Sequence, residues 1–408
     1  MGGVTEPVSD EVLLARAYLS RVSDPGSVPV WGYVRSVGPV AAARAIAHGH
    51  VPDEVRRATA SRRDDADPYA DLEAAERHGI RLVTPETDEW PHFAFAALER
   101  TGIDRLKRYQ AGDRKRAEAG EPMPPLALWV RGTAELASVG VRSVGMVGSR
   151  SATRYGERIS AELSYGLAQR EVVVVSGGAY GIDAAAHRGA LAADGPTVLV
   201  SAGGLDRPYP PGNTNLFERV AESGLLVSES PAGCAPQRHR FLSRNRLIAA
   251  LGTGTVVVEA GQRSGAANTA KHCRTLQRPL MAVPGPVDSA MSIGCHNLIR
   301  AESNPAILVT CLDDVLAVVG GSSDVPQISA GQLPSTDGLR EVLDRLDPSA
   351  RRVFDGLFAR RFARPDEIAV RSGTSALEVI RALPTLDLAR LIETGDAGYR
   401  IAARLRKA

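Results

Sequence analysis

Short apolar runs separated by glycine-rich turns dominate the middle of the chain. Each run is three or four residues long and apolar on both faces, and helical periodicity fills the gaps, as in residues 155–169 and 184–193. Such runs are typical of parallel strands that are covered by helices on both sides. The pattern therefore predicts an α/β fold with a Rossmann-like, doubly wound parallel sheet. The expected strands are residues 144–147, 172–175, 197–200, 225–227, 255–258 and 280–283.

The segments before this region are mostly helical in pattern, and residues 1–80 are predicted to form a small helical, SAM-like module. The expected helices are residues 12–20, 31–46 and 72–78. Strands are expected over residues 81–84 and 126–130. Between them, residues 100–116 are rich in arginine and lysine, but these cations do not gather on one helical face. We therefore expect a solvated helix there and not a DNA-binding stripe.

A polar stretch rich in glycine, serine and proline follows the sheet region, and residues 321–338 are expected to form a linker. Beyond it, several helical segments precede a terminal strand at residues 398–401. The helical segments are residues 350–358, 365–369, 375–383 and 386–393. A group of helices followed by a β-wing is the order of a winged-helix domain, which we expect in residues 339–408. The Rossmann-like domain is then expected to cover residues 81–320.

Composition and charge narrow the functional class. The 408 residues are 44% hydrophobic and 24% charged, with a net charge of +2, as in a soluble globular protein. A nucleic-acid site must therefore be a local cluster of arginines. The four cysteines are isolated and lack the C-x-x-C spacing of zinc sites, so no metal or cofactor is expected. Neither a secretory signal nor an apolar run of membrane-spanning length is found, which predicts a cytoplasmic protein without membrane contact.

Ligands of doubly wound sheets bind beyond the carboxyl ends of the strands, so the loops after the apolar runs form the candidate site. After the first run, Gly148 permits close approach of the backbone, and Ser149 and Thr153 can donate to phosphate oxygens or cap the next helix. N–H groups at a helix start attract anions, and Arg150 can add a bidentate clamp. The glycine spacings of dinucleotide-binding and Walker A loops are absent.

The loop after the second run is a tight turn whose glycines expose backbone groups. It contains Ser176, Gly177, Gly178, Ala179 and Gly181. Asp183 and His187 lie four residues apart in the following helix, where they could pair for catalysis. We favour capping by Asp183 and packing by His187, because no serine or cysteine nucleophile is placed to complete a triad.

Several arginines surround one aromatic residue after the fourth run, beyond Ser228 and Glu229. The group comprises Arg238, Arg240, Phe241, Arg244, Asn245 and Arg246. This combination suits single-stranded nucleic acid, because guanidinium groups hold phosphates while a ring stacks on an unpaired base. We expect Phe241 to be exposed; the alternative is a core phenylalanine beside ordinary surface charges. After the fifth run, Glu259 precedes another loop of small residues at a helix start. That loop and helix include Ser264, Gly265 and Thr269.

Taken together, these motifs resemble those of the DNA-processing protein A family, also called DprA or Smf. The matching segments keep the family's order and spacing over about half of the chain. They are Gly148-Ser149-Arg150, Thr153, Tyr155-Gly156, Ser176-Gly177, Gly181-Ile182-Asp183, Ala186-His187, Gly204-Leu205-Asp206, Tyr209-Pro210, Asn213, Ser228-Glu229, Phe241, Arg244-Asn245-Arg246, Glu259, Ser264-Gly265, Thr269-Ala270 and Pro284-Gly285. Leu242 stands where the family usually has proline, and residues 100–116 look like an insertion.

The resemblance implies an extended Rossmann domain that binds single-stranded DNA without catalysis. It also implies a homodimer that protects incoming DNA and loads a RecA-type recombinase during DNA uptake and recombination. By the same resemblance, Arg150 holds phosphate, and Phe241, Arg244 and Asn245 belong to the strand-binding pocket.

Two other classes of function stay open. Residues 251–255 together with Glu259 are similar to the pattern of enzymes that bind or hydrolyse nucleoside monophosphates, although Leu251 replaces the first glycine of that pattern. The third class is a pure adaptor, in which the Rossmann-like domain dimerises and the winged helix binds a protein.

Overall fold

The computed structural model describes residues 8–113, 122–262, 264–319, 346–358, 361–388, 391–395 and 398–402. The chain divides into two compact units, Met1–Val325 and Pro326–Ala408. The expected linker at residues 321–338 lies outside the described residues. Within the described part, no helix combines the length and the hydrophobicity that a membrane span requires.

A nine-stranded sheet organises the first unit, in the order β1-β2-β6-β5-β4-β3-β7-β8-β9. The strands are β1 (Ile80–Val83), β2 (Leu128–Gly132), β3 (Ser143–Val147), β4 (Val173–Gly177), β5 (Thr197–Val200), β6 (Leu225–Ser228), β7 (Gly254–Val257), β8 (Leu280–Ala282) and β9 (Ile307–Leu308). All neighbours from β6 to β9 pair in parallel, whereas β1 and β2 form an antiparallel edge. The α/β prediction is confirmed, and all six expected runs are strands; β9 was not expected.

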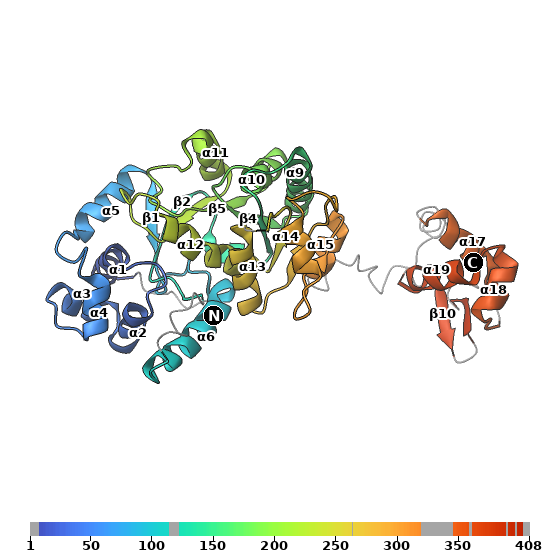
Figure 1. Ribbon diagram of the computed structural model, residues 1–408, viewed down its shortest axis with the longest axis horizontal. Coiled ribbons are helices and arrows are strands. Elements are labelled where there is room, and N and C mark those ends of the chain that lie inside the picture. Colours follow the sequence, from blue (N-terminus) through green and yellow to red (C-terminus); the bar gives the residue numbers. More distant parts are fainter. Residues whose placement is uncertain are drawn as a thin grey trace, which may run out of the picture. The chain divides into compact units, whose positions relative to one another are not determined.

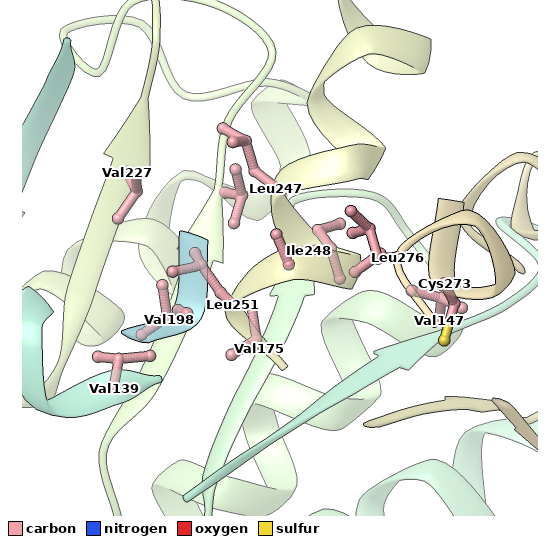
Figure 2. Packing of buried hydrophobic residues seen from close by; sticks show 14 of the residues in the cluster. Val139, Val147, Val175, Val198, Val227, Leu247, Ile248, Leu251, Cys273 and Leu276 are labelled. Carbon is pink, nitrogen blue, oxygen red and sulfur yellow. The ribbon is translucent and has the colours of Figure 1, made fainter. Parts of the chain in front are cut away.

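Helices cover both faces of this sheet (Figure 1). On one face lie α9 (Arg154–Ala168), α10 (Ile182–Ala192) and α11 (Thr214–Ser223); on the other lie α12 (Arg238–Leu251) and α13 (Ala266–Thr275). Neighbouring strand residues enter different cores: Val174 packs in the cluster of α9 and α10, whereas Val175 packs in the cluster of α12. Figure 2 shows Leu247, Ile248 and Leu251 of α12 among the valines of the strands. Fully burying each such side chain contributes about 1.5–3 kcal/mol.

Five helices precede the sheet, and one expected helix is divided in two. They are α1 (Asp10–Val22), α2 (Val28–Val37), α3 (Pro39–Ala47), α4 (Asp53–Thr59) and α5 (Pro68–Arg77). A single helix over residues 31–46 is wrong, because Gly38 has a φ of +83° and Pro39 begins a new helix. The sequence reading also missed α4.

The cationic stretch continues a helix that packs against the sheet domain. α6 (His92–Gln110) contacts α2 and α12, and its Arg105 is buried. The expectation of a solvated helix is met at the exposed cations Arg100 and Lys107 but not at the buried Arg105, and residues 114–116 lie outside the described part. The remaining elements of this unit are α8 (Leu136–Val139), the 3-10 helix η1 (Pro211–Asn213), α14 (Ile293–Ile299) and α15 (Leu312–Val319).

The second unit has the element order of a winged helix. It consists of α17 (Pro348–Gly356), α18 (Pro365–Ser372), α19 (Ala376–Leu388), β10 (Ile392–Gly395) and β11 (Gly398–Ile401). The two strands pair in an antiparallel hairpin. A helix over residues 386–393 is wrong: α19 runs through Pro384 to Leu388, and the chain then enters β10. Burial of Val379, Leu383 and Leu386 in this unit's core stabilises the longer helix.

Candidate functional site

A cavity of about 770 Å³ opens at the carboxyl ends of β3 and β7. β4, β5 and β6 lie on one side of β3, while β7, β8 and β9 lie on the other, so the chain order of the sheet reverses at this point. Crevices form at such switch points because successive connections depart to opposite faces of the sheet. This is the edge of the sheet at which we expected a ligand.

The loop after β3 supplies one part of the lining. Gly148 has no room for a side chain, since a Cβ there would lie 2.5 Å from Cγ1 of Ile182 and 2.7 Å from the carbonyl oxygen of Glu259. The Ser149 N–H donates to that carbonyl at 2.7 Å, and the Ser149 carbonyl accepts from the Ile182 N–H at 3.2 Å. These bonds fix the loop between the end of β7 and the start of α10. Arg150, the next residue, is exposed and lines the cavity.

Aromatic rings supply another part of the lining. Phe241, in the first turn of α12, is half-buried, and Tyr209, just before η1, is 47% exposed. Their ring centroids are 5.7 Å apart, with an interplanar angle of 54°. The guanidinium carbon of Arg150 lies 5.0 Å from the centroid of the Phe241 ring, within cation–π range. Arg238 adds a second exposed cation at the start of α12.

Two buried ionisable groups lie at this site, Asp183 in α10 and Arg244 in α12. The guanidinium of Arg244 donates to the Val200 carbonyl and, through Nε, to Oδ1 of Asn245 at 3.2 Å. Burial lowers the pKa of Arg244 to about 10, and burial raises the pKa of Asp183. Because the pKa of Arg244 stays well above neutrality, its guanidinium is charged, and its donors serve the fold.

The start of α9 already holds an anion that belongs to the protein. The buried carboxylate of Glu259 accepts from the Thr153 N–H at 2.8 Å and from the Thr153 hydroxyl at 2.7 Å. The Thr153 hydroxyl oxygen accepts in turn from the Gly156 N–H at 3.2 Å and caps the helix. We expected this helix start and Thr153 to receive phosphate. That expectation is corrected, because the Glu259 carboxylate occupies the position that attracts anions.

Two of the expected DNA-binding arginines are used inside the fold. The side chain of Arg246 is 3% exposed and forms a bidentate ion pair with Glu229, at 2.5 and 2.6 Å. Nε of Arg246 donates to the Met123 carbonyl at 2.7 Å. Arg240 is also buried and donates to the Ala235 carbonyl at 3.2 Å. The expectation that Arg240 and Arg246 contact DNA is therefore corrected, since neither side chain reaches the cavity lining.

Comparison with known proteins agrees with the resemblance in the sequence. A family model described as DNA recombination-mediator protein A matches residues 114–320. A putative DNA processing protein DprA from Mycobacterium tuberculosis is 46% identical over 392 residues, which cover 96% of this chain and 95% of the relative. The chain belongs to the DNA recombination-mediator protein A family.

Other members of the DNA recombination-mediator protein A family extend the match. Protein Smf of Escherichia coli is 34% identical over 70% of this chain and 73% of its own. The X-ray structure of DNA processing protein A from Streptococcus pneumoniae superposes with a TM-score of 0.59 at 26% identity, covering 77% of this chain and 99% of that one. Membership in the family gives this chain a role in DNA processing.

In this family member, the cavity brings together ten of the residues singled out in the sequence. They are Gly148, Ser149, Arg150, Ala179, Asp183, Phe241, Asn245, Ser264, Gly265 and Thr269. A second group lies outside the lining and is mostly buried near it, and comprises Ser176, Gly177, Gly178, Gly181, His187 and Arg244. The roles of all these residues in DNA binding stay predictions.

Some lining residues of the family member's cavity were not among the predicted site residues, although Arg238 belonged to the arginine cluster and Tyr209 to the segments that match the family. They include Ser151, Tyr209, Pro236, Arg238, Leu242 and Met291. A helical signal was available for two of them: Arg238 and Leu242 share one face of α12 with Phe241 and Asn245, at spacings of three, four and seven residues. Recognising that α12 begins at Arg238 would have separated this face from the buried face that carries Arg240 and Arg244.

His187 is buried in the core of the sheet domain, and its ring nitrogens lie 2.9 Å from the Gly177 carbonyl oxygen and 2.8 Å from Oγ1 of Thr197. A carbonyl only accepts, so the neutral ring donates from Nε2 to Gly177. Burial lowers the pKa of His187 and that of the buried His272 to about 4. Both rings are therefore neutral in the folded protein near pH 7, which suits packing and not proton transfer.

Stability is expected to fall as the pH drops from about 6.5 to about 4. The unfolded histidines take up protons near pH 6.5, whereas folded His187 and His272 resist protonation down to about pH 4. Each histidine removes roughly 3 kcal/mol of stability across this window, and the raised pKa of Asp183 offsets part of the loss at the acid end. Urea unfolding at pH 7, 6 and 5 measures the slope. Constant stability from pH 7 to pH 5 contradicts the assignment of both rings as buried and neutral.

Proposed function

We propose that the chain is a non-catalytic protein that binds single-stranded DNA in the cavity at the ends of β3 and β7. The observation that carries this proposal is the lining itself, which combines the exposed cations Arg150 and Arg238 with the rings of Phe241 and Tyr209. Cations attract the phosphates of any nucleic acid, whereas rings contact only bases that are unpaired and unstacked. Single-stranded DNA is the ligand that uses both features, and it fits the family's role in DNA processing.

Labelled oligo-dT is expected to bind with an affinity that falls as salt rises. For single strands, the logarithm of the binding constant falls by about 0.7 per neutralised phosphate for each decade of salt. Phosphate contacts by Arg150 and Arg238 therefore give a plot of log binding constant against log salt concentration whose slope is about −1.4 or steeper. Fluorescence anisotropy at four salt concentrations measures this slope. A fully paired duplex of the same length should compete poorly. Salt-independent binding, or equal competition by the duplex, contradicts the proposal.

We further propose that the protein is a cytoplasmic homodimer that protects incoming strands and loads a RecA-type recombinase during DNA uptake. The name of the family as recombination mediators supports a handover of DNA to a recombinase. Sedimentation equilibrium should give about twice the chain mass of 43.2 kDa. Purified RecA-type recombinase should form filaments faster on strands already coated by single-strand-binding protein when this chain is added. If filament formation is not accelerated, the chain does not load the recombinase, and the proposal that it binds DNA is unaffected.

The absence of catalysis is part of the same proposal. The carboxylate that the hydrolase-like pattern would use, Glu259, is bound by Thr153 at the start of α9 and does not line the cavity. Incubation with AMP and related nucleoside monophosphates should therefore release no free base. Turnover that disappears in Glu259→Gln overturns this part of the proposal.

A further inference from the structure

The two rings of the cavity differ in what they offer to a ligand. One side of the Phe241 ring carries the guanidinium of Arg150, whose central carbon is 5.0 Å from the ring centroid. The Tyr209 ring approaches the same phenylalanine with centroids 5.7 Å apart and a tilt of 54°. Phe241 thus contacts both a cation and a second ring and is half-buried, whereas Tyr209 is 47% exposed. An incoming base finds more open aromatic surface on Tyr209 than on Phe241.

The segment that carries Tyr209 is held in place before any ligand arrives. The buried Asn213 donates through Nδ2 to the Gly178 carbonyl at 3.0 Å and to the Ala179 carbonyl at 3.2 Å. The Gly212 N–H donates to the hydroxyl of Tyr180 at 3.2 Å. These bonds tie η1 to the turn after β4, so Tyr209 stands at a fixed place on the rim. A ring that is already ordered loses little conformational entropy when a base stacks on it.

We propose that Tyr209 is the base-stacking residue of the cavity and that Phe241 is a positioning residue, which holds the Arg150 guanidinium where it meets phosphate. Phosphate recognition and base recognition are then carried by adjacent but different side chains. The cation–π contact keeps Arg150 over the ring, and a backbone phosphate reaches its outward N–H groups. This division of roles rests on the proposed binding of single-stranded DNA.

Two oligonucleotides of equal length separate these roles: oligo-dT, and the same backbone with abasic tetrahydrofuran sites in place of every base. Tyr209→Ala is expected to weaken oligo-dT binding at least about five-fold, the low end for losing one stacked base, and to leave abasic binding unchanged. Tyr209→Phe keeps the ring and should bind both probes as the parent chain does. Tyr165→Ala is the matched control, because Tyr165 is 41% exposed on α9 and does not line the cavity.

Phe241→Ala is expected to weaken both probes to a similar extent, because it releases Arg150 from its position. Phe241→Tyr, which restores an aromatic face for the guanidinium, should rescue both. If Phe241→Ala weakens only oligo-dT, then Phe241 is the stacking residue and the proposal is overturned. It is also overturned if Tyr209→Ala affects both probes equally or neither. Tyr209→Trp gives a second readout, since its fluorescence should be quenched by oligo-dT and not by the abasic probe.

Binding by the parent chain distinguishes failure of the proposed DNA binding from failure of the proposed roles of Tyr209 and Phe241. If the parent chain binds neither probe, single-stranded DNA is not the ligand and the proposed function falls. If it binds both probes and the Tyr209 variants are indistinguishable from it, only the division of roles falls. Thermal unfolding of each variant checks that the substitutions leave the fold intact.

Discussion

Replacing both Arg150 and Arg238 with alanine is expected to weaken the binding of single-stranded DNA at least about 100-fold. These two arginines are exposed and line the cavity, so their donors are available to phosphate oxygens. A hydrogen bond to a charged group is worth about 1.5–3 kcal/mol, so two such contacts contribute about 3 kcal/mol or more. Fluorescence anisotropy with labelled oligo-dT at fixed salt measures the loss, and the slope of affinity against salt should decrease at the same time.

Arg158→Ala with Arg188→Ala is the matched control for this double variant. Both residues are exposed on helices of the same domain and do not line the cavity, so the change in net charge is equal while the proposed contacts remain. The control should alter affinity only slightly, through long-range charge. Equal losses in the two double variants mean that general charge and not the cavity holds the strand. Arg244→Ala is unsuitable here, because Arg244 is buried and its removal disturbs the fold.

The sequence predicted six strands of the parallel sheet well because these strands are buried on both faces. A run such as Leu199-Val200 has no polar side to offer, and only a strand between two helical layers removes both side chains from water. The helix divided at Gly38 was harder, since its apolar periodicity continues across the break. The structure turns there through a positive φ, which no hydrophobic pattern reports. β9 was missed although its two residues, Ile307 and Leu308, lie in a short apolar run.

The site was predicted in part, and the failures share a physical cause. A pattern of arginines shows where cations are, but not on which face of a helix they lie. In α12, Arg238 lines the cavity, whereas Arg240 is buried only two residues later, about half a turn around the helix. The arginine pattern does not show that the helix begins at Arg238. Without the correct first turn, exposed and buried cations could not be told apart.

The start of α9 shows the same limit for anions. Helix geometry correctly indicates that a negative group belongs there, but physical chemistry does not say whether the group is a ligand or a side chain of the protein. Glu259 follows β7, more than one hundred residues after Thr153, and reaches it only because β7 lies beside β3 in the sheet. The spacing of residues along the chain does not reveal a contact that depends on which strands are neighbours in the sheet. The prediction of phosphate binding therefore moves from the helix start to the exposed side chains that line the cavity.

Arg246→Ala is expected to lower the free energy of unfolding by about 3–5 kcal/mol while leaving the cavity lining in place. The substitution leaves the Glu229 carboxylate, whose side chain is 9% exposed, without its bidentate partner. Urea unfolding measures the loss. Arg158→Ala serves as the control, because Arg158 and Glu162 form an exposed pair whose removal costs at most about 1 kcal/mol.

The same variant distinguishes a structural arginine from a DNA-binding one. Measured well below its unfolding temperature, Arg246→Ala should bind oligo-dT within about three-fold of the parent chain, because hydrogen bonds of Arg246 end inside the protein, at Glu229 and Met123. If Arg246→Ala is as stable as the parent chain but binds oligo-dT more weakly, the ion pair of Arg246 with Glu229 opens to admit DNA. Arg246 is then a DNA-binding residue. Replacing Arg246 and Glu229 together by leucine should restore much of the stability, since no buried charge is then left unpaired.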